Sequence, residues 1–416
     1  MKHIFLLSII FLSSCSKKIE TESNLVSIQI TDQNGLSETI STSDKLSKYQ
    51  QVDFTDAQPY QKVFRVFKKD SQGKSKSILT TYYPNGQIEQ YLECTQITAF
   101  GAYRKWYANG QLNIEAQVIG GPADINPLAQ RQWLFEGESK VYDEDGTLSA
   151  KINYSKGLLE GLSTYYFTDG KVKEEVNYKQ NYLAGKRKLY RHQGVVYIEE
   201  NYLLGVKSAE QKGFFNDEKK AFLEFYSKGL IETGIYYEEQ GKTLCKIQDG
   251  NGKQALYNAF GVERFVEYKA GVPDGLVEIY SADHNLIRSF NQLDGKKQGI
   301  EKLYYPDTDS IKLTMQWDDD TIHGSVKTYY LNGKQESQKE MSRNKKNGMS
   351  FAWYENGDLM LMEEYDNDAL IKGTYYEKGD SDPISKIQNG SGVATLFEKD
   401  GSFLRKVTYK KGEPVD

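Results

Sequence analysis

The stretch "YYLNGKQES", Tyr329 to Ser337, decides the fold, because near-copies of it recur along the chain. Three of them are "YYPNGQIEQ" from Tyr82, "WYANGQLNI" from Trp106 and "WYENGDLML" from Trp353. An Asn-Gly pair between short aromatic and β-branched runs indicates a two-residue β-hairpin turn, because both residues tolerate a positive φ. Each copy therefore predicts one β-hairpin.

The copies recur at a regular interval between residues 60 and 416. The turn glycines are Gly86, Gly110, Gly146, Gly170, Gly194, Gly241, Gly261, Gly333, Gly357, Gly379 and Gly401, mostly about 24 residues apart. Degenerate turns at Asn216-Asp217, His284-Asn285 and Thr308-Asp309 fill three gaps. Apolar and charged residues alternate between the turns, which is typical of half-buried strands. Because a lone hairpin is marginal in water, neighbouring hairpins must stack. We predict an all-β fold, an elongated, twisted antiparallel array of about fourteen β-hairpins of about 24 residues each.

A longer block of sequence is also repeated. "KIQDGNGKQALYNAFG", Lys246 to Gly261, returns as "KIQNGSGVATLFEKDG", Lys386 to Gly401. The preceding "GIYYEE" and "GTYYEK", from Gly234 and Gly373, match as well. A block of several hairpins was therefore duplicated as a unit.

The order Gly, Tyr, Asn-Gly and a following Tyr-x-x-Gly resembles the bacterial variant of the MORN repeat. "GSVKTYYLNGKQESQKEMSRNKKNG" from Gly324 is a good example, and the resemblance extends from about Tyr60 to Gly412. It implies a solenoid of β-hairpins. Many bacterial members of this family are labelled antitoxins of toxin–antitoxin systems, and eukaryotic relatives are linked to membranes and to protein assembly.

The first residues predict a lipoprotein signal peptide. A basic start precedes the apolar run Ile4 to Leu12, which is far shorter than the roughly 20 residues of a membrane-spanning helix. Leu12-Ser13-Ser14-Cys15 resembles the bacterial lipoprotein cleavage box, which implies a lipid on Cys15. We expect a lipid-anchored cell-envelope protein of the outer membrane, facing the periplasm or the cell surface. The polar residues 16–59 predict a tether with a short strand or hairpin near Leu25 to Ile40.

Composition and motifs argue against several function classes. The net charge is −5 with no basic block, so nucleic acid is not an expected partner. Gly73-Lys74-Ser75 lacks the upstream glycine of a phosphate loop, so we expect no nucleotide. The histidines and cysteines form no ligand motif, so no metal or other cofactor is expected. The acidic run Asp318 to Asp320 favours solubilising charge, with a calcium loop as the alternative.

Two features remain as candidate binding sites. The interval from Gly110 to Gly146 is longer than the others, and its extra residues 119–133 predict an inserted loop on a binding face. The candidate residues of this loop are Pro122, Asp124, Asn126, Pro127, Arg131 and Trp133. Adjacent strand residues point to opposite faces, so one ring of each aromatic pair is expected to be left on a second face. The candidate rings are Trp106, Tyr107, Tyr165, Tyr166, Tyr329, Tyr330, Trp353 and Tyr354.

Taken together, these observations favour a non-enzymatic, lipid-anchored repeat protein that binds another protein as a scaffold. One alternative is a module that binds cell-wall or other polysaccharide through the exposed rings. Another is an antitoxin-like protein that masks one specific partner. The alternative interpretation of the aromatic pairs is that the rings on both faces pack between hairpins and bind no ligand.

Overall fold

The computed structural model describes residues 24–59, 61–216, 218–258 and 260–415. The expected signal peptide and Cys15 lie outside these residues. Within them, all 34 strands belong to one antiparallel sheet, which confirms the predicted all-β array of hairpins. The chain divides into two compact units, Met1–Ala184 with Tyr190–Gly194, and Gly185–Leu189 with Val195–Asp416. No helix in the described part of the chain is long and apolar enough to cross a membrane.

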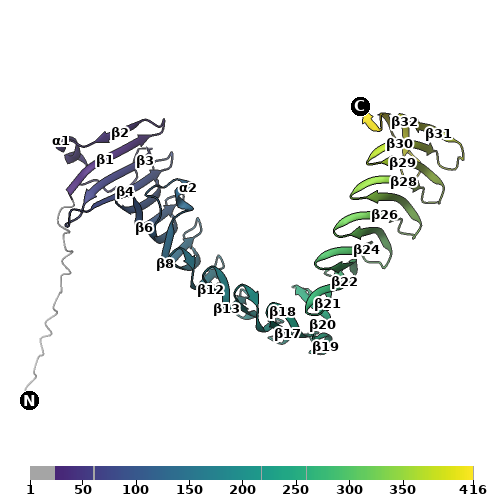
Figure 1. The fold of residues 1–416 in the computed structure, drawn as a ribbon, viewed down its shortest axis with the longest axis horizontal. Coiled ribbons are helices and arrows are strands. Elements are labelled where there is room, and N and C mark those ends of the chain that lie inside the picture. The colour runs from purple at the N-terminus through teal and green to yellow at the C-terminus, as the bar shows by residue number, and fades with distance from the viewer. Residues whose placement is uncertain (1–23, 60, 217, 259, 416) are drawn as a thin grey trace, which may run out of the picture. The chain divides into compact units, whose positions relative to one another are not determined.

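In the first unit the first strand lies between the second and the third, and the later strands follow one another in chain order (Figure 1). The strands are β1 (Asn24–Asp32), β2 (Ser37–Ile40), β3 (Gln61–Lys69), β4 (Ser75–Tyr82), β5 (Ile88–Thr95), β6 (Thr98–Trp106), β7 (Leu112–Gly120), β8 (Leu134–Tyr142), β9 (Leu148–Ser155), β10 (Leu158–Leu159), β11 (Gly161–Tyr166) and β12 (Val172–Lys179). Short helices α1 (Ser43–Leu46), η1 (Ser47–Tyr49) and α2 (Pro127–Gln130) accompany them. Strand β13 (Tyr182–Tyr190) contributes residues to both units.

The second unit consists of strands and turns. Its strands are β14 (Val196–Leu203), β15 (Val206–Lys207), β16 (Ala209–Phe214), β17 (Lys220–Ser227), β18 (Leu230–Tyr237), β19 (Thr243–Gln248), β20 (Asn251–Asn258), β21 (Gly261–Lys269), β22 (Val272–Tyr280), β23 (Leu286–Leu293), β24 (Lys296–Tyr304), β25 (Ile311–Asp318), β26 (Thr321–Tyr329), β27 (Gln335–Ser342), β28 (Lys345–Trp353), β29 (Leu359–Asp366), β30 (Ala369–Tyr376), β31 (Pro383–Gln388), β32 (Ser391–Phe397), β33 (Phe403–Lys410) and β34 (Glu413–Val415).

The Asn-Gly turns differ from the prediction. At Asn332-Gly333 only the glycine has a positive φ, 80°. Gly333 N donates to Tyr330 O at 2.9 Å, and Tyr330 N donates to Lys334 O at 2.9 Å. This is a type I turn closed by a glycine bulge, rather than a two-residue turn. The Asn332 side chain instead accepts from Lys334 N at 2.9 Å. The prediction of two positive φ angles here was therefore wrong, because a local sequence signal cannot distinguish these two glycine-requiring turns.

Two-residue turns occur at the opposite strand ends, where the sequence suggested only polar links. Arg343 and Asn344 have φ values of 49° and 68° and join the directly paired residues Ser342 and Lys345. Two consecutive positive φ values are the mark of a type I′ turn. This link is therefore a hairpin turn, and from β25 to β30 the two turn types alternate.

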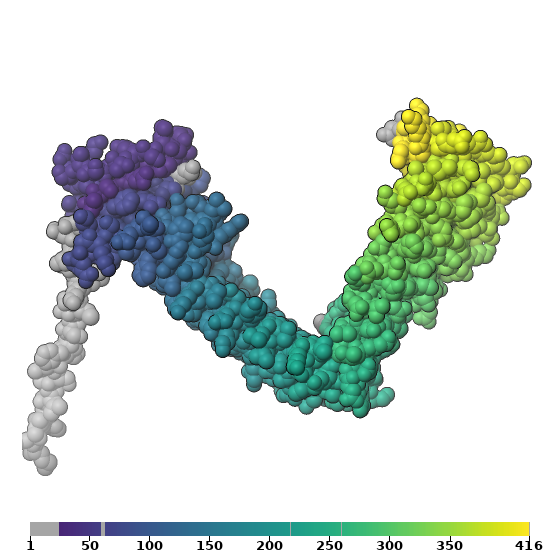
Figure 2. Space-filling model, in the orientation of Figure 1, coloured from purple at the N-terminus to yellow at the C-terminus, as the bar shows by residue number. Residues whose placement is uncertain are grey.

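Residues 24–59 contain folded structure, whereas the sequence suggested a tether. Strand β1 pairs with β2 and also with β3, so the expected hairpin is part of the main sheet. Ile28, Leu46 and Phe54 pack with Phe64 in one core cluster. Figure 1 shows α1 and β2 beside β1, and Figure 2 shows this part of the chain, in purple, against the residues that follow it. These residues therefore form the first layer of the repeat array.

One face of the sheet in the second unit, which we call the inner face, holds a continuous row of buried and half-buried residues. Register places Glu301, Met315, Val326, Lys339, Ser350, Glu363, Gly373 and Ile387 side by side along it. Glu301, Val326 and Ile387 are at most 5% exposed. The opposite face, here the outer face, carries the alternate residues of the same strands.

The duplicated block has the same backbone structure in both copies. In the first copy Gly271 N donates to Gly250 O and Ile231 N donates to Gly271 O, at 2.9 and 3.2 Å. In the second copy the matching bonds join Gly412 to Gly390 and Leu370 to Gly412, at 2.9 and 3.0 Å. A Cβ on Gly250 would lie 2.5 Å from Gly271 N, so the close approach requires glycine. Three turns that are separate in sequence thus meet in each copy.

Candidate functional site

In five repeats a tyrosine at the start of the turn connects one hairpin to the next. Tyr330 lies in the turn rather than in a strand, and its hydroxyl donates to Trp353 O at 2.7 Å. The same contact recurs from Tyr83 to Trp106, Tyr107 to Tyr142, Tyr305 to Tyr329 and Tyr354 to Tyr376, at 2.7–3.0 Å. In each case the acceptor is the last residue of a strand in the following repeat. Burial raises the pKa of Tyr330 to about 12, so the hydroxyl keeps its proton and remains a donor at neutral pH. We call these contacts the tyrosine ladder.

A second ladder lies at the type I′ turns. Asn344 N donates to Ile322 O at 3.0 Å, and the Asn344 side chain accepts from Ile322 N at 2.9 Å. Asn181, Asp320 and Asp368 make the same pair of bonds to Leu159, Lys297 and Lys346. Asp320, one of the acids considered for calcium, therefore binds a backbone N–H group. This Asn/Asp ladder and the tyrosine ladder stabilise opposite edges of the array.

None of the eight candidate rings is fully exposed. Tyr330 and Tyr354 are 5% and 0% exposed, and the other six are half-buried. Tyr107, Tyr330 and Tyr354 belong to the tyrosine ladder. Phe351 and Trp353 stack on one face of β28 with ring centroids 5.8 Å apart. These contacts serve packing between hairpins, while glycan binding by the rings stays a prediction.

The inserted residues 119–133 fold onto the sheet. Trp133 is 5% exposed, packs edge-on against Tyr103 at 4.8 Å and donates from Nε1 to Pro122 O at 3.1 Å. Asn126 caps α2 by accepting from two backbone N–H groups, and Asp124 accepts from Asn126 N at 3.1 Å. The side chains left exposed include Asn126, Pro127, Leu128 and Arg131. Trp133 therefore stabilises the core, and a binding role for the exposed tip stays a prediction.

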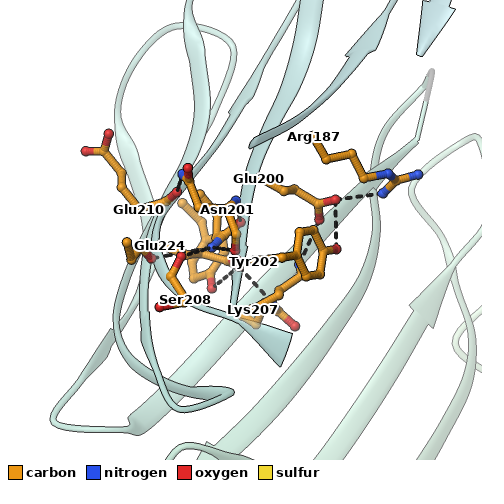
Figure 3. Close-up of polar contacts among 12 residues, drawn as sticks. Arg187, Glu200, Asn201, Tyr202, Lys207, Ser208, Glu210 and Glu224 are labelled. Carbon is orange, nitrogen blue, oxygen red and sulfur yellow. Dashed lines mark hydrogen bonds and ion pairs between the residues drawn. The ribbon is translucent and has the colours of Figure 1, made fainter. Parts of the chain in front are cut away.

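The structure also reveals buried carboxylates that the sequence analysis did not identify. Glu200 is 8% exposed and accepts from Arg187 at 2.7 Å, Tyr202 at 3.0 Å and Lys207 at 3.0 Å (Figure 3). Burial raises the pKa of this carboxyl, but Lys207 and Arg187 outweigh the burial and hold the pKa below its usual value. The neighbouring Gln211, fully buried, bonds both backbone groups of Asn201 at 2.8 and 3.0 Å.

A carboxylate on the strand before each copy of the duplicated block accepts a hydrogen bond from a tyrosine of that copy. Glu224 accepts from Tyr236 and Gln254, both at 2.7 Å. Before the second copy Glu363 accepts from Tyr365 and Tyr375 at 2.9 and 2.8 Å. Burial, with the carboxylate nearby, raises the pKa of Tyr236 and Tyr375 far above the usual tyrosine range. These hydroxyls are therefore hydrogen-bond donors rather than nucleophiles. Recurrent Glu and Tyr within two residues of each other, as in "EEY", was the available sequence signal.

The remaining reactive residue types have ordinary structural roles. Burial raises the pKa of Cys94 to about 11 and of Cys245 to about 12, so neither thiol is activated. The His192 ring stacks on the Phe167 ring with their centroids 4.1 Å apart, and His284 lies in a turn with a positive φ of 62°. Among the described residues no three His, Cys, Asp or Glu side chains gather as metal ligands.

Comparison with known proteins identifies the repeat. The family model described as MORN repeat variant matches two adjacent repeats, residues 135–156 and 159–180, so the chain contains MORN-variant repeats. No curated protein matches the chain. A solved porin-like protein from Bacteroides uniformis ATCC 8492 matches 58% of this chain and 94% of its own, with 8% identity and a TM-score of 0.13. A similarity this low carries no argument about fold or function.

Proposed function

We propose that this repeat array is a non-enzymatic scaffold of the cell envelope, anchored by a lipid on Cys15, that binds a partner protein. One observation carries the proposal: the recurring polar groups of the repeat bind the neighbouring hairpin. The tyrosine ladder, the Asn/Asp ladder and the carboxylates on the inner face all stabilise contacts between strands. The outer face is then available as a repetitive surface, as solenoid proteins use it.

The first experiment is capture of the partner. The full chain, tagged at its C-terminus, is expressed in its own host, cross-linked in cells and purified, and the bound proteins are quantified by mass spectrometry. A single protein in stoichiometric amount is the expected result. Envelope glycan recovered without protein would favour the polysaccharide alternative, and a toxic partner silenced by binding would favour the antitoxin-like alternative. A substrate turned over by the purified chain would contradict all three.

The inserted loop is tested in the same experiment with point variants, because its deletion would expose the core around Tyr103. Leu128 is 69% exposed at the loop tip, and Leu128→Glu with Arg131→Glu changes the surface but not the buried Trp133. Leu36→Glu is the matched control, since Leu36 is 71% exposed on another hairpin turn. Loss of the partner from the loop variant alone would place the contact there. Equal recovery from both variants would move the contact elsewhere on the array.

A further inference from the structure

The outer face of the second copy of the duplicated block is hollowed. Between β28 and β31 lies a half-open cavity of about 270 Å³, whose lining includes Met349, Met362, Thr374 and Lys386. Register confirms that Met362, Thr374 and Lys386 are cross-strand neighbours in one row of this face. The volume is below the roughly 300–1,000 Å³ of a small-molecule site, and it fits one large side chain of a partner.

The floor of this cavity is more apolar than the rest of the cross-strand row that leads to it. The cross-strand row that leads to it is Lys302, Thr314, Lys327, Gln338, Phe351, Met362, Thr374 and Lys386. Phe351 and Met362 are its only apolar members, and Trp353 stacks beside Phe351. Methionine side chains adapt to an incoming ring and make favourable sulfur–aromatic contacts. An otherwise polar row thus becomes apolar at the cavity.

The cavity lining contains one lysine that forms no salt bridge to a described residue. Lys372 is neutralised by Glu364 at 3.0 Å. The carboxylate of Glu363 accepts from Tyr365 and Tyr375 on the inner face. Lys386 is exposed and forms no ion pair with any residue that the structure describes. A ligand that brings a carboxylate to Lys386 therefore gains electrostatic complementarity.

The first copy of the block carries a different set of side chains at the corresponding positions. Its corresponding row is Lys212, Leu223, Ile235 and Lys246. The lysine at the end is retained, but Lys212 stands in place of Phe351 and Ile235 in place of Thr374. The first copy therefore provides a matched site with the same backbone and the same terminal lysine.

We propose that the cavity docks an extended acidic segment of the partner protein, which inserts an aromatic side chain over Met349 and Met362 and places a carboxylate at Lys386. This proposal rests on the scaffold function and specifies the chemistry of the partner. In an extended peptide residues i and i+2 point to the same side, so Trp-x-Asp presents both groups together.

The probe is a fluorescein-labelled synthetic peptide, Gly-Ser-Gly-Trp-Ser-Asp-Gly-Ser-Gly, titrated with the purified full chain and followed by fluorescence anisotropy. Replacing Trp by Ala, or Asp by Lys, is expected to weaken binding by about tenfold or more. Met362→Lys should weaken it similarly, whereas Leu223→Lys at the matched site of the first copy should not. Lys386→Glu should reverse the charge preference, so that the Lys peptide binds more tightly than the Asp peptide.

Equal binding of the Trp-Asp peptide to wild type, Met362→Lys and Lys386→Glu would overturn the proposal, as would no binding at all. Binding of chitotetraose, competed by neither peptide and lost in Met362→Lys, would assign the cavity to glycan and overturn it too. Circular dichroism of each variant shows whether the fold is retained, and the charge reversal cannot arise from unfolding. If the peptides fail while a stoichiometric protein is still captured, only this inference falls and the scaffold function stands.

Discussion

Removing one hydroxyl from the tyrosine ladder tests whether the ladder holds neighbouring repeats together. Tyr330→Phe keeps a ring that is 5% exposed and deletes only the donor to Trp353 O, 2.7 Å away. The adjacent Tyr329→Phe is the control within the same dipeptide, because the Tyr329 hydroxyl makes no hydrogen bond to another described residue. The two variants lose the same atom at neighbouring positions.

The expected cost follows from the hydrogen bond and from the acceptor that is left behind. A net intramolecular hydrogen bond is worth about 0.5–1.5 kcal/mol, and a buried carbonyl left unpaired costs about 1–3 kcal/mol. Trp353 is half-buried, so water can reach part of its surroundings, and we expect a loss of about 1–2 kcal/mol in Tyr330→Phe. For Tyr329→Phe we expect about 0.5 kcal/mol or less, as for other surface changes.

Native-state hydrogen exchange of the full chain measures this loss locally, which matters because repeat arrays unfold in parts. The informative amides lie in β28 and in the turn after it, where Gly357 N donates to Tyr354 O. A loss of one to two kcal/mol should accelerate their exchange by a factor of about 5–30 in Tyr330→Phe. Exchange that is equally fast in both variants, or unchanged in both, would refute the role of the ladder.

Three further predictions concern other contacts. Asn344→Ala should speed amide hydrogen exchange around Ile322 more than Asn344→Gly does. Both variants lose the side-chain acceptor, but only alanine is strained at a φ of 68°. Equal effects would show that the loss of the side-chain hydrogen bond dominates over backbone strain. The folded pKa of Glu200 lies below 4.5, so its ion pairs contribute their full stability above pH 4.5, and this stability is lost as the pH falls through the folded pKa. In urea unfolding measured at a series of pH values, the midpoint should therefore fall less steeply toward acid pH in Glu200→Gln than in the wild type. The same fall in both proteins would argue against a stabilising role for these ion pairs. Cys15→Ala should abolish incorporation of an alkyne-labelled fatty acid and release the chain from the membrane fraction, whereas label retained in this variant would contradict lipid attachment at Cys15.

Much of the architecture was predictable because the determining signals are local. Glycine positions and the alternation of apolar and charged residues placed the hairpins and the repeat length. The turn type was not predictable, since Asn332-Gly333 satisfies the glycine requirement of either turn and only cross-strand pairing decides between them. The link at Arg343-Asn344 carries no glycine, so its two positive φ angles had no recognisable signal.

The candidate sites were less predictable, because burial depends on contacts far apart in sequence. Trp133 stood out as an aromatic in an inserted loop, yet Tyr103, 30 residues earlier, covers it. Residues 24–59 look polar overall, but a few apolar side chains such as Ile28 and Phe54 suffice to pack on β3. The cavity at Met362 depends on four strands meeting in register, which no single stretch encodes.

The sequence by itself therefore determined the repeat, the hairpins and the class of fold, because turn and strand preferences act within a few residues. Tertiary structure alone decided what each aromatic does. Tyr329 and Tyr330 are chemically identical neighbours, but one ends a strand while the other enters the turn and reaches the next repeat. That difference arises from the bulge that shifts the register after Thr328, a property of the paired strands rather than of either residue.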